Sequence, residues 1–260
     1  MAERYFHKKR YGQHFLHDQN ILQKITQSIN PLNQDHVIEI GPGQGVLTEH
    51  IVNKVQRLDL IEIDQDLVKH LKQHFQQPNL FIHQADILKF GLNSLIKKNQ
   101  VVRIIGNLPY NISTPILFKL CQHASNIQDM MFLLQKEVVI RMCAQPNSKE
   151  YGRLSIMIQY FCEVKRIMDV PAGAFNPPPK VKSSTVSLKP YKTSPHPASN
   201  FNHFEMLVRT AFCHRRKTIH NALKGVIDTS KLNQININPS LRPENLSLND
   251  YVRISNFFSV

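Results

Sequence analysis

The chain has 260 residues, 42% of them hydrophobic, and 32 Lys and Arg against 19 Asp and Glu, which gives a formal net charge of +13. This length and composition suit a globular protein with a substantial core, built as one large domain or two unequal ones. The positive charge favours a polyanionic partner such as nucleic acid without identifying it, and an anionic membrane surface remains an alternative reason for the charge.

The cysteines and the first residues indicate the compartment. Four cysteines are widely spaced without a Cys-x-x-Cys pair, so neither a zinc site nor a disulfide framework is indicated: Cys121, Cys143, Cys162 and Cys213. Residues 1–10 carry charge where a signal peptide needs an apolar stretch. No apolar run approaches the ~20 residues that span a bilayer. We therefore expect a cytoplasmic protein with reduced thiols, no membrane contact and no metal.

The N-terminal arm mixes cations with aromatic rings. Lys8, Lys9 and Arg10 are interleaved with tyrosine and phenylalanine over residues 1–12, a pattern that suits an RNA contact because cations neutralise phosphates and rings stack on bases. A frayed, solvated terminus is the alternative. The apolar spacing that follows, at residues 21, 22, 25 and 29, predicts a helix that ends before Pro31.

A glycine-rich loop over residues 39–48 is the feature around which the chain is organised. It follows the apolar run 37–38 and precedes an amphipathic stretch, so it reads as strand, tight turn and helix. Gly41, Gly43 and Gly45 permit positive φ angles and leave the backbone open to a ligand. A dinucleotide fingerprint requires a small residue where this chain has Val46, which disfavours a nicotinamide-dependent oxidoreductase.

Three further apolar runs end in polar residues. The runs at 58–64, 80–82 and 101–105 lead to Glu62, to Asp86 and to the Asn-Leu-Pro-Tyr segment 107–110. The carboxyl ends of parallel strands meet at one sheet edge, where open α/β sheets bind ligands and where an acid after the second strand binds a ribose diol. The same acids could serve a hydrolase that uses paired carboxylates, but no second motif in the sequence supports that alternative. We predict further strands at 130–134, within 154–170 and at 185–188.

The Asn-Leu-Pro-Tyr segment is the most specific chemical signal, and it resembles the target-amine motif of methyltransferases that act on adenine amines. An aromatic amine is a poor nucleophile, because its lone pair is delocalised into the ring. The carboxamide oxygen of Asn107 and the backbone carbonyl of Leu108 can each accept a hydrogen from such an amine and align its lone pair. Pro109 stiffens the turn and Tyr110 can stack on a base.

These segments resemble the donor and target motifs of class I methyltransferases that act on adenine amines. The segments 11–16 and 175–181 narrow the resemblance to the ribosomal RNA adenine dimethyltransferases, from about residue 8 to the C-terminus. Segment 215–219 is similar to the bacterial branch that dimethylates two adjacent adenosines near the 3′ end of small-subunit rRNA, rather than to the large-subunit macrolide-resistance methylases. The resemblance implies an α/β fold with a class I Rossmann-like sheet and a small C-terminal all-helical domain.

The resemblance also implies roles for individual residues. S-adenosylmethionine would be bound by His14, Leu16, Gly41, Gly43, Glu62, Asp86 and Asn107. Catalysis would involve Asn107, Leu108, Pro109, Tyr110 and Phe175. In the family, the Phe-x-Pro-Pro-Pro-Lys-Val loop closes on the target, so Phe175 and Tyr110 would sandwich the flipped adenine. His14 stands where the family usually has Asn.

Composition predicts how the chain is divided. We expect an N-terminal arm and sheet domain over residues 1–192, a linker over 193–200 and a helical domain over 201–260. RNA contacts are expected from Lys8, Lys9, Arg10, Lys180, Arg215, Arg216 and Lys217. His203, Cys213, His214 and His220 lack metal-ligand spacing. The expected partner is immature small-subunit rRNA, bound by a monomer; a large-subunit methylase and a non-catalytic assembly factor are the alternatives.

Overall fold

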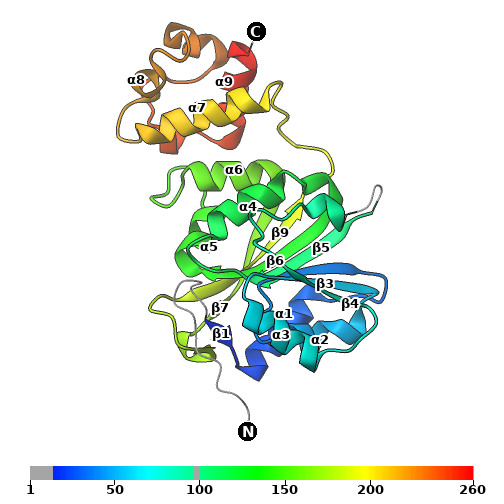
Figure 1. The fold of residues 1–260 in the computed structure, drawn as a ribbon. Coiled ribbons are helices and arrows are strands. Elements are labelled where there is room, and N and C mark those ends of the chain that lie inside the picture. The colour runs from blue at the N-terminus through cyan, green and yellow to red at the C-terminus, as the bar shows by residue number, and fades with distance from the viewer. Residues whose placement is uncertain (1–13, 97–99, 260) are drawn as a thin grey trace. The chain divides into compact units, whose positions relative to one another are not determined.

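The computed structural model describes residues 14–96 and 100–259, which form two compact units (Figure 1). Residues 1–139 and 165–190 belong to a sheet unit, and residues 140–164 and 191–260 belong to a C-terminal unit. Residues 140–164, which the sequence-based division assigned to the sheet domain, therefore group with the C-terminal unit. The change of unit near residue 191 lies beside the Pro-rich and Ser-rich stretch predicted as a linker.

A seven-stranded sheet forms the first unit, in the order β4-β3-β2-β5-β6-β9-β7. The strands are β2 (His36–Ile40), β3 (Arg57–Glu62), β4 (Leu80–Gln84), β5 (Val102–Asn107), β6 (Ile127–Gln135), β7 (Cys162–Val170) and β9 (Ser183–Pro190). Strands β4, β3, β2, β5 and β6 are parallel, and β9 is antiparallel to β6. The strand order reverses beside β2, so its carboxyl end lies at the position where such sheets bind ligands.

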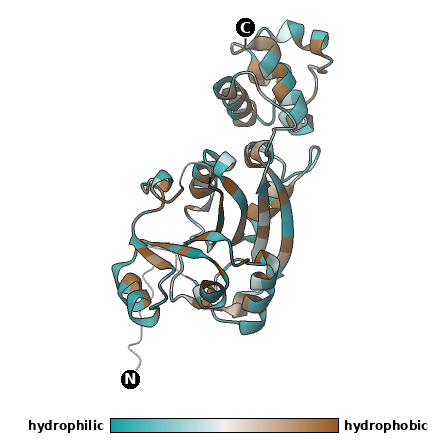
Figure 2. Cartoon of the chain, turned by 90° about the vertical axis from the view of Figure 1, so that its right-hand side faces the viewer, coloured by the Kyte–Doolittle hydropathy of each residue, from teal (hydrophilic) through white to brown (hydrophobic). Residues whose placement is uncertain are grey.

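The central strands are apolar on both faces because helices cover them. Val37, Ile38, Leu58, Leu60 and Ile104 are fully buried, as expected for parallel strands between two helical layers. Figure 2 shows hydrophobic and hydrophilic residues interleaved along the helices and strands. One hydrophobic cluster joins these strands to residues of α1 (Gln19–Ile29) and α2 (Val46–Ile51). Burial of this cluster fixes the sheet edge that carries the predicted ligand residues.

Helix α1 begins and ends at residues with the expected capping chemistry. Asp18 accepts a hydrogen bond from the Ile21 amide at the start of α1, and Asn30 ends that helix in the left-handed region. The sheet unit also contains α3 (Gln65–His74), α4 (Ser113–Cys121), the start of α5 (Lys136–Cys143) and the short helices η2 (Val52–Lys54), η3 (Leu92–Ser94), η4 (Ala124–Asn126) and η5 (Ala172–Ala174). The predicted helix before Pro31 is confirmed.

The prediction of strands within residues 154–170 is wrong for the first part of that range and confirmed for the second. Residues Arg153–Phe161 form helix α6, and β7 begins only at Cys162. Leu154, Ile156 and Ile158 alternate like a strand, but Met157 is buried with them. A helix that is buried around its circumference loses the 3.6-residue pattern, so alternation alone misleads.

The C-terminal unit is helical after residue 200. It contains α7 (Phe201–Cys213), α8 (Ile219–Leu223), η6 (Thr229–Ile235), η7 (Pro243–Asn245) and α9 (Leu248–Phe258). Asn200, Thr218 and Ser247 each accept a backbone N–H at the start of a helix. The predicted helical segment is thus confirmed. Among residues 14–96 and 100–259, no helix is both long and apolar enough to span a membrane.

Candidate active site

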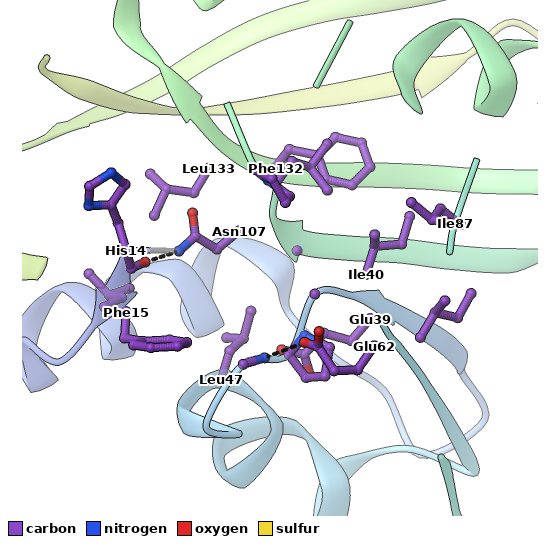
Figure 3. Close-up of a pocket in the computed structure, with 18 of the residues that line it drawn as sticks. His14, Phe15, Glu39, Ile40, Leu47, Glu62, Ile87, Asn107, Phe132 and Leu133 are labelled. Atoms are coloured by element: carbon purple, nitrogen blue, oxygen red, sulfur yellow. Dashed lines mark hydrogen bonds between the residues drawn. The ribbon is translucent and has the colours of Figure 1, made fainter. Parts of the chain in front are cut away.

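A pocket opens at the carboxyl ends of the parallel strands, within the sheet unit (Figure 3). Its walls come from the N-terminal arm, the glycine loop, the segments after β3 and β4, and the segment after β5. Figure 3 shows Asn107 beside His14 on one side of the pocket, and Glu39 and Glu62 on another. The pocket lining includes nearly all of the predicted donor and target residues: His14, Leu16, Gly41, Gly43, Glu62, Asp86, Asn107, Leu108, Pro109 and Tyr110.

The glycine loop has the backbone conformation that its sequence predicts. Gly41, Gly43 and Gly45 have φ angles of 68°, 60° and 86°, which side chains rarely adopt. A Cβ atom at Gly43 would also lie 2.9 Å from the ring of Phe15. All three glycines are therefore required by the turn, and Gly43 is required also by the N-terminal arm that packs against it.

Glu62 lies at the end of β3 and is tied to the glycine loop. Its carboxylate accepts hydrogen bonds from the Gly43 amide at 3.3 Å and the Asp64 amide at 2.9 Å, and the residue is 5% exposed. Burial raises the pKa of Glu62, and the backbone hydrogen bonds oppose that rise. Asp86 lies farther along the same wall, where it accepts a hydrogen bond from the Leu88 amide.

Asn107 ends β5 with its side-chain amide held in one orientation. Its Nδ2 donates to the backbone carbonyl of His14 at 2.8 Å, which commits the amide nitrogen to the N-terminal arm and leaves the amide oxygen as the acceptor side. Tyr110 shares a 2.5 Å hydrogen bond with Ser183 on β9. Leu108 is 1% exposed and its amide donates to the Leu133 carbonyl. These contacts fix the turn between two strands and the arm.

Phe175 is the predicted catalytic residue that the structure does not bring into the pocket. It lies in β8 (Phe175–Asn176), which pairs with β1 (Phe15–Leu16), and it is 2% exposed within the main hydrophobic cluster. A ring packed in the core cannot stack on a base without leaving that cluster, so the predicted sandwich of Phe175 and Tyr110 is not formed. The ring that stacks on Tyr110 belongs to His14.

Glu39 is a pocket residue that the sequence reasoning missed. It lies in β2 directly before the glycine loop, is 2% exposed and accepts a 2.7 Å hydrogen bond from Thr48 Oγ1. Burial raises its pKa from 4.5 to about 7. The signal in the sequence was a lone acid inside an otherwise apolar strand. A carboxyl group buried in this way requires either a hydrogen-bond partner or a proton.

Replacing Glu39 by glutamine should change how stability depends on pH. Because the folded pKa is raised, the free energy of unfolding falls as pH increases from about 4.5 to about 7. The neutral amide keeps the acceptor for Thr48 and avoids this loss. At pH 8 we expect Glu39→Gln to be more stable than the parent by up to about 3 kcal/mol in urea unfolding. The exposed Glu49→Gln variant is the control, and equal pH profiles for parent and Glu39→Gln would refute the assignment.

The predicted RNA-binding residues lie in several places. Lys8, Lys9 and Arg10 lie outside the described residues. Lys180 is exposed in the sheet unit, and Arg216 and Lys217 are exposed in the turn between α7 and α8. Arg215 is engaged within its own unit, because it pairs with Glu244 and donates to the Lys149 carbonyl at 2.6 Å. Its charge is therefore less available to a phosphate than that of its two neighbours.

The histidine and cysteine side chains of the C-terminal unit do not converge. Across residues 14–96 and 100–259, no group of three or more His, Cys, Asp or Glu side chains could hold a metal ion. His203 instead contacts Ser255 and Ser259 through Nδ1.

The sheet order, the reversed strand β9, the glycine loop and the Asn-Leu-Pro-Tyr turn together define a class I Rossmann-like methyltransferase. The ribosomal RNA adenine dimethylase family matches residues 5–259. The chain therefore belongs to that family, and the predicted resemblance is confirmed.

Relatives and solved structures agree with this assignment. A Pseudomonas savastanoi protein named ribosomal RNA small subunit methyltransferase A is 49% identical over all of this chain and 98% of its own length. The crystal structure of a dimethyladenosine transferase from Plasmodium falciparum is similar with a TM-score of 0.81 at 28% identity, covering 93% of this chain and 96% of that one. The 23S rRNA methyltransferase ErmE shares the fold, with a TM-score of 0.71 at 21% identity over 95% of this chain and all of its own.

Proposed function

We propose that the protein dimethylates the exocyclic amines of two adjacent adenosines near the 3′ end of small-subunit rRNA, with S-adenosylmethionine as methyl donor. The observation that carries this proposal is the orientation of Asn107. Its amide nitrogen is committed to the His14 carbonyl, so its oxygen is the group that can accept a hydrogen from an amine. The nearly full-length relative named for the small subunit supports the choice of substrate.

The residues of the pocket fit the chemistry of the methyl donor. The buried Glu62 carboxylate suits a ribose diol, and Asp86 suits the amine of the donor adenine. Ile63 and Ile87 line the same wall and supply apolar surface for the base. Gly41 and Gly43, together with Leu16 and the backbone of His14 in the arm, would close around the remainder. When bound, S-adenosylmethionine supplies an electrophilic methyl group.

The residues after β5 would prepare the target amine. The Asn107 oxygen and the Leu108 carbonyl accept its two hydrogens, which turns the nitrogen lone pair away from the ring and toward the methyl group. Tyr110, held by Ser183, offers a face on which the base stacks. The contribution is positioning and electrostatic stabilisation, without a covalent enzyme intermediate.

The target base must leave its stack to reach this pocket. Lys180 is an exposed cation of the sheet unit suited to a phosphate contact, and Arg216 and Lys217 offer a second RNA-binding surface on the C-terminal unit. Lys8, Lys9 and Arg10 extend the basic composition into the arm, and Arg215 would contribute mainly by holding its turn. The immature small subunit would be bound by a monomer in the cytoplasm, where ribosomes assemble.

A methyl-transfer assay tests the proposal. Small subunits purified from a strain that lacks these dimethylations are incubated with the protein and labelled S-adenosylmethionine, and the modified positions are mapped by mass spectrometry. We expect dimethylation of two adjacent adenosines near the 3′ end. Methylation of naked large-subunit RNA instead would assign a resistance methylase. Tight binding to small subunits without incorporation would indicate a non-catalytic assembly factor.

A further inference from the structure

The imidazole of His14 lies against Tyr110 on the target side of the site. The two rings are nearly parallel, at 26°, with centroids 5.7 Å apart. His14 Nδ1 donates to the backbone carbonyl of Pro177 at 2.8 Å. Pro177 follows β8, the strand that pairs with the arm at Phe15 and Leu16. The side chain expected to contact the methyl donor therefore faces the stacking residue for the target base.

The space between these two rings is too small for a base. Two aromatic contacts at about 3.5 Å each would place the outer rings about 7 Å apart. The observed centroid distance is 5.7 Å, so an adenine cannot enter between His14 and Tyr110 as they lie. Either one ring moves away when the base arrives, or the base does not stack on this face of Tyr110.

His14 is the side chain with the weaker attachment. Tyr110 is held through its hydroxyl by Ser183, and its ring belongs to the turn that Leu108 anchors to β6. Among the described residues, the His14 ring is held by a single hydrogen bond, to the Pro177 carbonyl, and it lies directly before the two-residue strand β1. Rotation of the imidazole breaks that bond but leaves the backbone bond from Asn107 to the His14 carbonyl intact.

Resting on the proposed function, we infer that His14 is a specificity-determining gate residue: its imidazole occupies the stacking face of Tyr110 in the free enzyme, and the target adenine displaces it. The gate lowers the apparent affinity for RNA by the fraction of molecules in which the face is free. Bases that stack weakly on Tyr110 would fail to displace the ring, so the gate favours purines in the pocket.

Binding measurements on His14→Ala test the gate. The RNA probe is a short single strand containing two adjacent adenosines, and the same strand with two uridines is the comparison. We expect His14→Ala to bind the adenosine strand at least threefold more tightly and S-adenosylmethionine within twofold of the parent. On small subunits, KM should fall by a larger factor than any change in kcat, because the imidazole competes with the target base for Tyr110. The control is His17→Ala, an exposed histidine on the same arm, which should match the parent.

A spectroscopic measurement tests the stack without turnover. In histidine-labelled protein, the His14 ring resonance, identified by its loss in His14→Ala, should be shifted upfield by Tyr110 and should return toward its ordinary position when the adenosine strand binds. Weaker RNA binding by His14→Ala would overturn the gate and make His14 a stacking partner. If His14→Ala lost affinity for S-adenosylmethionine but not for RNA, the His14 side chain would be assigned to the donor site and the gate would be refuted. If small subunits are not methylated, the proposed function fails, but the upfield shift in the free protein still tests the stack.

Discussion

Replacing Asn107 by alanine is expected to lower methyl transfer by ~10²-fold or more while leaving the affinity for S-adenosylmethionine within a few-fold. The reason is that the amide oxygen acts on the reacting amine, where its hydrogen bond strengthens as the nitrogen becomes tetrahedral; loss of one oriented group of this kind costs 10² to 10³ in turnover. Single-turnover transfer to small subunits gives the rate, and calorimetry gives the donor affinity.

A second variant at residue 107 tests whether the orientation of the acceptor oxygen matters in addition to its presence, and an exposed asparagine serves as the control. Asn107→Asp keeps the oxygens but cannot donate to the His14 carbonyl, so it should lose most of the activity as well. Asn111→Ala, an exposed asparagine four residues along, should retain full activity. A parallel loss of donor binding and turnover in Asn107→Ala would remove Asn107 from its role on the amine.

The positions of Glu62, Asp86 and Asn107 could be predicted because each follows an apolar run. Once the runs are read as parallel strands, topology gathers their carboxyl ends at one edge, and no knowledge of side-chain packing is needed. The glycine loop is equally local, since positive φ angles at Gly41, Gly43 and Gly45 depend only on the turn. Most residues of the pocket could therefore be predicted from the local chemistry of the turns and from the order of the strands.

The roles of Phe175, His14 and α6 depend on contacts between segments distant in sequence. Pairing of β1 with β8 joins residues 16 and 175, and it sends the Phe175 ring into the core while bringing His14 onto Tyr110. Nothing in either segment alone indicates that pairing. The same holds for α6, whose strand-like alternation is overridden by burial on every side.

Arg103 connects the first helix to the sheet from inside the protein. Its guanidinium donates to Asp35 at 2.7 Å and to Asp129 at 2.8 and 3.0 Å. It also donates to the carbonyls of Ile29 and Asn30, at the end of α1, at 2.5 and 3.0 Å. Arg103 is 8% exposed and Asp35 is 6% exposed, so water cannot replace these bonds.

Replacing Arg103 by methionine should lower the free energy of unfolding of the sheet unit by about 3–5 kcal/mol, since it leaves a buried carboxylate and two helix-terminal carbonyls without their donor. Urea unfolding at neutral pH measures the loss. Arg209→Met, an exposed arginine on α7, should change stability by no more than about 0.5 kcal/mol.

Adding Asp35→Asn to Arg103→Met decides between charge and packing as the cause. If the unpaired carboxylate dominates, the double variant loses less stability than the sum of the two single losses, because the second change removes the stranded charge. Strict additivity would instead assign the loss to packing. Because Arg103 lies outside the pocket lining, donor affinity measured well below the unfolding transition should match the parent in all three variants. The packing of α1 on the sheet would then depend on this network for stability, while the binding of the donor would not.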